Sequence, residues 1–317
     1  LALLVTTLVS LGAGCTATAH PSQTAELGTP SSSEAMEAVL DKQGPVILEK
    51  IRAADWAVPL SGLLDLDDPE ARAAGLEDRD EPIGIFLYIL RHPRFGTYLV
   101  DSGVQKAMRP DDGGGPIVGP LIQRVMHTDR MTVHVDTASW LEAEPSTIAG
   151  VFLTHLHLDH ILGLPDVPRG TPIYVGKGEP AERHLEHLFS RGTTDRALDG
   201  HDPLQEWNFA PDPTGRFAGV LDVFGDGSVW ALHAPGHTAG STAFVVRTPD
   251  GPALLTGDVS HTAWGWEHGV PPGSFTSDAA ANRKSLAALR SLAERHPRMK
   301  IHPGHQLLPA RTTLHAR

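Results

Sequence analysis

The stretch "FLTHLHLDHILGLPD" (residues 152–166) decides how the rest of this chain is interpreted. Directly behind an apolar run it places His155, His157, Asp159 and His160 within six residues. Such a group is either a solvated polar turn or half of a metal site. Burying this many polar side chains without ligands would be costly in free energy, which favours a metal site if the chain supplies further ligands.

Three later stretches each combine an apolar run, expected to be a β-strand, with one polar residue at its end. "VWALHAPGHTAGST" supplies His237, "ALLTGDVS" supplies Asp258 and "MKIHPGHQ" supplies His305. Any one of these alone is ordinary, but loops at strand ends are where a rigid scaffold holds reactive groups. Imidazole and carboxylate ligands without thiolate suit zinc or a similar first-row divalent ion. The four stretches together therefore predict a metal site.

Seven ligands are enough for two ions. The expected division is one ion held by His155, His157 and His237, a second held by Asp159, His160 and His305, and Asp258 bridging the pair. Two cations about 3.5–4 Å apart can share a hydroxide and lower its pKa towards neutrality. That bridging hydroxide is the expected nucleophile, and the exposed metal edge would polarise a carbonyl or phosphoryl oxygen of the substrate.

The composition limits the class of protein. With 317 residues, 40% hydrophobic and 20% charged, the chain is that of a soluble globular protein. A net charge of −12 argues against a nucleic-acid partner, because phosphate binding depends on clustered Lys and Arg. The single cysteine, Cys15, excludes an internal disulfide and a cysteine-based zinc cluster.

Residues 1–14, "LALLVTTLVSLGAG", are apolar and uncharged and are predicted to be a signal peptide. The run is shorter than the roughly 20 residues that span a bilayer. It resembles a bacterial lipoprotein signal, in which Cys15 would be lipidated and form a membrane tether. No basic leader precedes the run, which a truncated start would explain, and Gly12 stands where an aliphatic residue is usual. A cleaved secretory signal with an incidental cysteine is the alternative. Either predicts export to the cell envelope, as a periplasmic or membrane-anchored protein.

The remaining sequence divides into a tether and one domain. Residues 15–35 are rich in Ala, Thr, Ser and Pro, and predict a flexible tether, while residues 36–317 predict a single domain. Residues 82–90 and the following "TYLVD" predict a hairpin. Helices are expected over 181–190 and 278–295, the second with Ser277 as N-cap. Hairpin strands with few helices between them indicate sheets covered by helices.

The order HxHxDH, His, Asp, His resembles the signature of the metallo-β-lactamase superfamily. Here it consists of "HLHLDH", "PGHTAGS", "LLTGD" and "PGH", and the match extends from about Val46 onward, including "LVDSG" near Asp101. The resemblance implies an α/β (α+β) fold. This is an αββα sandwich of two mixed sheets flanked by helices, with the metals at one edge between the sheets. The predicted domain would be a hydrolase of this type.

Several branches of the superfamily match less well. Zinc β-lactamases typically lack the bridging aspartate, which this chain has as Asp258. Glyoxalase II carries a helical domain at this end, whereas few residues follow His305 here. The tRNA-processing members need a basic arm, and the net charge of −12 offers none. The best local match is to N-acyl-homoserine lactonases, through "HLHLDH", "APGHTAG", "LLTGDVSHT" and "VPPGSF". The resemblance therefore implies a small-molecule substrate, a lactone, and a homodimer, which is common in that branch. Methyl-parathion-hydrolase-like enzymes, which act on organophosphates, share the framework. A non-catalytic, metal-binding envelope lipoprotein is the alternative of another class.

Two residues are candidates for proton transfer. The resembled lactonases often carry a tyrosine three residues after the bridging aspartate, whereas this chain has His261. A histidine can donate a hydrogen bond or carry a proton near neutral pH, or His261 is simply a polar loop residue. Asp159, besides ligating the second ion, is placed to take up or deliver a proton during ring opening.

Substrate-contacting candidates are aromatic. Trp264 and Trp266 could line a pocket for an acyl chain or pack in the core, and Trp56 belongs to a segment that borders the substrate channel in the resembled family. His184 and His187 lie three residues apart on an expected helix, where they could hold an accessory metal. A solvated helix face is the favoured interpretation of that pair.

Overall fold

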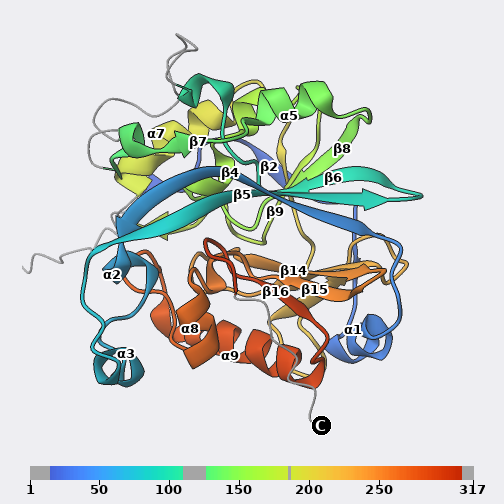
Figure 1. The fold of residues 1–317 in the computed structure, drawn as a ribbon. Helices are drawn as coiled ribbons and strands as arrows, with labels where there is room; N and C mark the ends of the chain where they lie inside the picture. The colour runs from blue at the N-terminus through green and yellow to red at the C-terminus, as the bar shows by residue number, and fades with distance from the viewer. Residues whose placement is uncertain (1–14, 110–125, 185–186, 309–317) are drawn as a thin grey trace, which may run out of the picture.

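The computed structural model describes residues 15–109, 126–184 and 187–308. In this part of the chain two large mixed sheets are stacked face to face, with helices on both outer sides (Figure 1). Helices α5 (Thr137–Ala143) and α7 (His187–Ala197) lie beyond one sheet, and α8 (Ala263–His268) and α9 (Ala279–Arg295) beyond the other (Figure 1). The expected αββα sandwich is confirmed.

Eight strands form the first sheet among the described residues. In order across the sheet they are β2 (Ser22–Thr24), β11 (Leu204–Glu206), β9 (Ile173–Val175), β8 (Ile148–Phe152), β6 (Gly96–Val100), β5 (Asp80–His92), β4 (Ile47–Pro59) and β7 (Thr132–Val133). Strands β5 and β6 are the predicted hairpin, and β4, β5 and β7 are antiparallel to their neighbours. Strands β6, β8, β9, β11 and β2 run parallel.

Six strands of the described chain form the second sheet, and most neighbours in it are antiparallel. In order they are β16 (Lys300–His302), β15 (Gly251–Leu255), β14 (Thr242–Thr248), β13 (Val229–His233), β12 (Gly219–Asp222) and β3 (Thr29–Pro30). Only β15 and β16 are parallel. A separate two-stranded pair joins β1 (Cys15–Thr16) to β10 (Arg183–His184).

Short helices and turns connect the strands. They are α1 (Ser33–Leu40), α2 (Leu60–Leu63), α3 (Pro69–Ala73), α6 (Leu158–Ile161), and the 3₁₀ turns η1 (Lys106–Met108), η2 (Thr128–Arg130), η3 (Leu164–Asp166) and η4 (Gly257–Val259).

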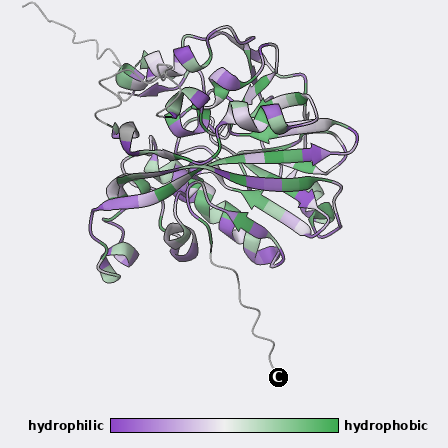
Figure 2. Ribbon diagram, turned by 45° about the horizontal axis from the view of Figure 1, so that its top comes forward, coloured by the Kyte–Doolittle hydropathy of each residue, from purple (hydrophilic) through white to green (hydrophobic). Residues whose placement is uncertain are grey.

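The core between the sheets is aromatic. The Phe152 ring lies 5.8 Å from that of Phe244 across the two sheets and 5.4 Å from that of Trp207. Strands β5, β14 and β15 are buried along nearly their whole length, because one face packs on the opposite sheet and the other on helices or loops. This explains their continuous apolar runs, which Figure 2 shows in green along the central strands.

Helix α9 confirms the second helix prediction with a change at its start. The N-cap is Asp278, whose side chain accepts a hydrogen bond from the Ala281 amide, whereas Ser277 was expected. The helix buries Leu286, Leu289 and Leu292 in the cluster beneath the second sheet. Ser277 has another function, since its amide donates to the carbonyl of His237 at 3.0 Å.

The helix predicted over 181–190 is wrong in its position. Strand β10 occupies Arg183–His184, and α7 begins at His187 and continues to Ala197. Pairing of His184 with Cys15 holds the backbone extended, a tertiary contact that helix propensity does not include. His184 and His187 therefore do not share a helix face, and their ring centroids lie 6.1 Å apart.

The segment predicted as a flexible tether is instead built into the fold. Strand β2 pairs with β11 at the edge of the first sheet, and β3 pairs with β12 at the edge of the second. Ala17 and Ala25 are buried, and helix α1 begins at Ser33. The composition does not predict this order, because the order comes from backbone hydrogen bonds. Sheet edges offer unpaired backbone donors and acceptors, and a segment with few apolar side chains can still pair with them.

Some predictions fall outside the described residues. The signal peptide (1–14) does, and with it export and lipidation of Cys15 stay predictions, as does the homodimer. The Gly/Pro-rich stretch "PDDGGGPIVGP" (residues 110–120), whose composition predicts a surface loop, also lies outside the described residues. Of the helices in the described part of the chain, none combines the length and apolar character needed to cross a bilayer.

We expect Ala25→Lys to lower the free energy of unfolding by on the order of 3 kcal/mol, because Ala25 is buried in the core cluster between the sheets. The matched change Thr24→Lys places the same charge on an exposed neighbour in β2 and should have little effect. Urea denaturation of both variants measures the difference. Equal tolerance of the two substitutions is what a flexible tether would give.

Candidate metal centre and substrate cavity

The seven predicted ligands converge at one edge of the sandwich. The "HLHLDH" motif follows β8 in the first sheet, with His157 immediately before helix α6. His237, Asp258 and His305 follow β13, β15 and β16 in the second sheet. Each sheet therefore contributes part of the cluster, and the cluster lies where the two sheets meet.

Three imidazoles form the first group. The Nε2 atom of His237 lies 3.1 Å from Nε2 of His155 and 2.8 Å from Nδ1 of His157. Burial and the neighbouring imidazoles hold the pKa of His155 and His237 well below the usual value. Burial likewise lowers the pKa of His157 to about 4. All three are therefore neutral at physiological pH, the state in which a histidine binds a metal.

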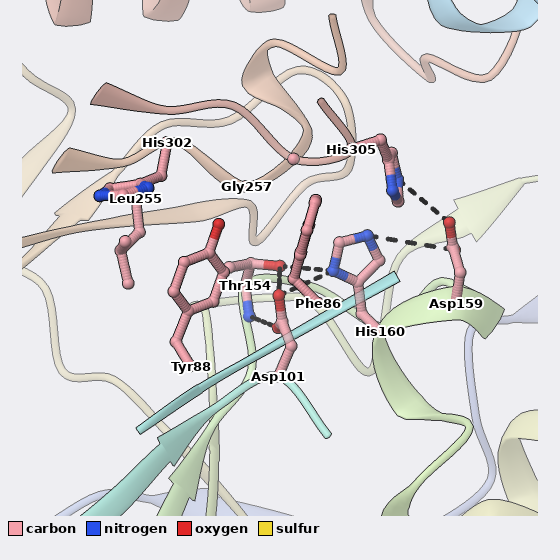
Figure 3. A pocket seen from close by; sticks show the side chains of 11 residues that line it. Phe86, Tyr88, Asp101, Thr154, Asp159, His160, Leu255, Gly257, His302 and His305 are labelled. Carbon is pink, nitrogen blue, oxygen red and sulfur yellow. Dashed lines mark hydrogen bonds and ion pairs between the residues drawn. The ribbon is translucent and has the colours of Figure 1, made fainter. Parts of the chain in front are cut away.

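The second group combines two carboxylates with two imidazoles. The Nε2 atom of His305 lies 3.1 Å from Asp159 Oδ2 and 3.1 Å from Asp258 Oδ2, and Nε2 of His160 lies 3.2 Å from the latter oxygen. Figure 3 shows Asp159 facing both His160 and His305. The candidate donor atoms of these four residues all lie within 4.8 Å of one another, and those of the first group do so as well.

The carboxylate of Asp258 lies between the two groups of candidate ligands. Its Oδ2 atom also lies 3.7 Å from His155 Nε2 and 3.6 Å from His237 Nε2. Its Oδ1 atom is buried and has no hydrogen-bond partner in the part of the chain that the structure describes. A buried carboxylate oxygen left unpaired is costly unless something outside the protein satisfies it. The residues therefore fit a pair of divalent ions bridged by Asp258.

Electrostatics support the same conclusion. Burial lowers the pKa of His305, but Asp258 and Asp159 outweigh this and raise it to about 10. Burial also acts against protonation of His160, yet Asp258, Asp101 and Asp159 raise its pKa well above the usual value. Three carboxylates in one buried site thus demand positive charge, which divalent cations supply when bound.

Asp101 supports the cluster through His160, and it lies outside the set of site residues that the motifs predict. It follows β6 and adopts a left-handed conformation with φ of 58°. Its carboxylate accepts hydrogen bonds from the amide and hydroxyl of Thr154, and from Nδ1 of His160 at 2.8 Å (Figure 3). The proton on Nδ1 leaves Nε2 of His160 free to bind a metal. The "LVDSG" match was the signal that could have identified it.

Glu179 is a second supporting residue, and no motif marks it. Its buried carboxyl accepts from the Leu156 amide at 2.7 Å on one oxygen, and from the Thr238 hydroxyl at 2.6 Å and the Gly240 amide at 2.9 Å on the other. Burial and the nearby Glu182 raise the pKa of Glu179 to about 7. Leu156 lies between two ligands and Thr238 follows a third, so this one side chain joins both ligand loops of the first group.

A cavity of about 530 Å³ opens against the cluster. Its metal side is formed by His157, Asp159, His237, Asp258, His261 and His305. The remaining wall is largely apolar and includes Trp56, Val58, Leu63, Ile83, Met126, Leu158, Phe189 and Phe275. This volume is in the range of small-molecule sites, whose walls are mostly hydrophobic with a few polar groups.

The structure separates the aromatic candidates. Trp56 lines the cavity, as do His187 and His261. Trp264 and Trp266 are not among the described residues that line it. Trp266 is buried in the cluster around α9, and Trp264 stacks on His268 at 4.1 Å. Both lie on α8, which turns their side chains into the packing between this helix and its neighbours.

An αββα sandwich with a histidine and aspartate cluster between its sheets is the arrangement of a metal-dependent hydrolase. Residues 112–305 match the model of the metallo-β-lactamase superfamily, and the chain belongs to that superfamily. This confirms the resemblance drawn from the motifs.

Relatives within the superfamily include lactonases. The chain is 31% identical over 219 residues to the N-acyl homoserine lactonase AttM of Rhizobium johnstonii, covering 68% of this chain and 80% of the relative. A solved quorum-quenching N-acyl homoserine lactone hydrolase superposes with a TM-score of 0.58 at 18% identity, over 87% of this chain and 97% of the other. AidC, a dizinc quorum-quenching lactonase solved with a product, gives 0.52 at 17% identity, over 90% and 92%.

Replacing Asp101 by Asn should weaken metal binding about 10–100-fold, because the amide nitrogen cannot accept the proton of His160 Nδ1. Competition with a chromogenic chelator measures the affinity. Asp136→Asn is the control, since Asp136 is also buried but caps helix α5 and pairs with Arg109 instead of with a ligand. Equal metal affinities of the two variants would contradict the supporting function of Asp101.

Glu179→Gln should lower the occupancy of the first ion group, because one of the three donors to Glu179 would then face an amide NH₂. Glu144→Gln is the matched control, with a buried carboxylate that pairs with Arg91 at 2.7 Å instead. The ratio of metal to protein after dialysis against a weak chelator measures occupancy. Two retained ions in Glu179→Gln would show that the carboxyl does not position these loops.

Proposed function

We propose that this protein hydrolyses lactones, N-acyl-homoserine lactones included. It would use two divalent metal ions, which we assign as zinc. The observation that carries the proposal is the apolar cavity that ends directly at the His and Asp cluster. An acyl chain suits the apolar wall, and an ester carbonyl suits the polar end. The names of the sequence relatives support the same substrate class.

The zinc assignment follows from the donor set. Five of the seven predicted ligands are imidazoles and two are carboxylates, without a thiolate, a composition that suits zinc. When bound, such ions activate water and polarise the carbonyl oxygen. His155, His157 and His237 would hold one ion, and Asp159, His160 and His305 the other, with Asp258 between them.

The protein's own side chains orient the substrate. Trp56, Leu63 and Phe275 line the apolar wall, and an acyl chain bound along them leaves the lactone ring at the polar end. Filling the cavity in this way excludes bulk water from around the ester. Hydrolysis breaks the bond between the acyl carbon and the ring oxygen, and the oxygen of water forms the new bond to the acyl carbon. One proton of the water goes to the ring oxygen, and the other is released when the carboxylic acid ionises.

We assign to Asp159 the transfer of that proton to the ring oxygen. Its side chain borders the cavity, and Oδ2 lies 3.1 Å from His305. Burial raises the pKa of Asp159, but His160 and His305 outweigh this and hold it below the usual value. Asp159 is therefore a carboxylate that can accept a proton from attacking water at one oxygen and release it to the departing ring oxygen.

We expect the zinc-loaded protein to turn over N-acyl-homoserine lactones with metal-dependent release of acid. Long acyl chains should give a lower KM than a simple γ-lactone, because they bury more surface against the apolar wall. The panel includes an aryl phosphotriester and a β-lactam, and pH-stat titration follows each reaction.

His157→Ala should reduce lactone turnover by more than about 100-fold. Removing a residue that hydrogen-bonds to a ligand typically costs about 10–100-fold in affinity or activity, and removing the ligand itself should cost more. His268→Ala, an exposed histidine stacked on Trp264, is the matched control and should remain active. Turnover of the triester alone would move the protein to organophosphate hydrolysis. Two bound ions with no hydrolysis of any substrate would favour a metal-binding protein without this activity.

A further inference from the structure

His261 lies within the metal cluster itself. It follows turn η4, two residues before helix α8, and its side chain is 2% exposed. Its Nε2 atom is 3.1 Å from Asp258 Oδ2, the same distance as Nε2 of His305 from that oxygen. Three imidazoles, those of His160, His261 and His305, thus point at one carboxylate oxygen.

The opposite side of the His261 ring determines which nitrogen carries the proton. Nδ1 lies 3.1 Å from the backbone carbonyl oxygen of Leu63. A carbonyl can only accept a hydrogen bond, so Nδ1 donates, and in the neutral ring Nε2 presents a lone pair to the cluster. His305 has the same arrangement, with Nδ1 donating to the Gly84 carbonyl at 3.1 Å. Metal-binding histidines are typically fixed in this way.

The ring also lies among the other candidate ligands. Its centroid is 4.9 Å from that of His237 at an interplanar angle of 81°, and 5.6 Å from that of His305 at 13°. The donor atoms of His237, Asp258 and His261 all lie within 4.8 Å of one another. His261 therefore has the distance, the burial and the tautomer of a ligand.

We propose that His261 is a further metal ligand of this protein, and that it binds the same ion as His237 and Asp258. The sequence alone allows His261 to donate a hydrogen bond, to carry a proton or to be simply a polar loop residue. Nε2 is the atom that faces the cavity and cluster, and in the neutral ring it has no proton to donate. The proposal rests on the dinuclear site of the proposed function, and it is independent of whether the substrate is a lactone.

This ligand would set the chain apart from the resembled lactonases, which often carry a tyrosine at this position. A tyrosine hydroxyl, with a pKa near 10, stays protonated at neutral pH and is a poor ligand there. An imidazole instead adds a neutral nitrogen donor without changing the charge of the site. The ion near His237 then has one ligand more than the three histidines and the bridging carboxylate provide.

The test compares His261→Ala and His261→Tyr with the control His268→Ala. Apparent affinities for Zn²⁺ are measured by chelator competition, and the protein loaded with Co²⁺ is examined by absorption spectroscopy. We expect both His261 variants to bind one of the two ions at least about 10–100-fold more weakly, the range known for losing an outer-shell partner. Their cobalt spectra should change, because one ion loses a nitrogen donor, and the control should match the native protein.

Thermal unfolding separates a ligand from a residue that only packs. If His261 is a ligand, its substitution should reduce the increase in melting temperature that saturating Zn²⁺ produces, in addition to any decrease seen in the metal-free protein. If His261 only packs, its substitution would lower the melting temperatures of the metal-free and the zinc-bound protein by the same amount.

Two results would overturn the proposal. One is native affinity for both ions with an unchanged cobalt spectrum in both variants. The other is native affinity for both ions together with an equal decrease in melting temperature in the metal-free and the zinc-bound variants. These measurements do not involve turnover, so a failure to hydrolyse lactones would contradict the proposed function and leave this inference intact.

Discussion

The buried carboxylate of Asp258 is the group on which the site depends. One oxygen lies within 3.7 Å of five imidazole nitrogens, and the other has no hydrogen-bond partner among the described residues. Such a charge is tolerated in the interior only if positive charge surrounds it. The histidines alone meet this demand by taking up protons, whereas bound cations meet it and leave the histidines neutral.

Glycines allow the backbone to approach this carboxylate. Gly257 has a φ of 52°, and a Cβ atom there would lie 2.9 Å from Cβ of Thr154. A Cβ atom at Gly304 would lie 2.0 Å from Oδ1 of Asp258. Gly236, with φ of 140°, similarly lets the loop before His237 lie against the start of helix α9. The three loops of the second sheet that carry ligands are therefore shaped by backbone positions that other residues would not fit.

The sequence predicted the cluster well because each ligand directly follows a strand whose apolar pattern is local. The sandwich followed from the same strands and from the resemblance. What it could not predict depends on contacts between distant segments. Glu179 acts through Leu156 and Thr238, and nothing near it in the chain indicates this.

The N-terminal segment and the region around β10 show the same limitation. Residues 15–35 are poor in apolar side chains, and only the unpaired edges of two sheets explain why they are ordered. Strand β10 is extended because β1 pairs with it, although its sequence suits a helix. Trp264 and Trp266 were ambiguous in the sequence because a helix near the site directs side chains both towards and away from it.

The N-terminal strands also bear on the solubility of the protein. Strands β2 and β3 are short and exposed, and their backbones pair with β11 in one sheet and β12 in the other. Short polar edge strands prevent the sheets of neighbouring molecules from pairing. Proteolytic removal of residues 15–32 would uncover both edges at once, because this segment contains both strands. The expected product is an aggregating protein, even though every residue of the metal cluster would still be present.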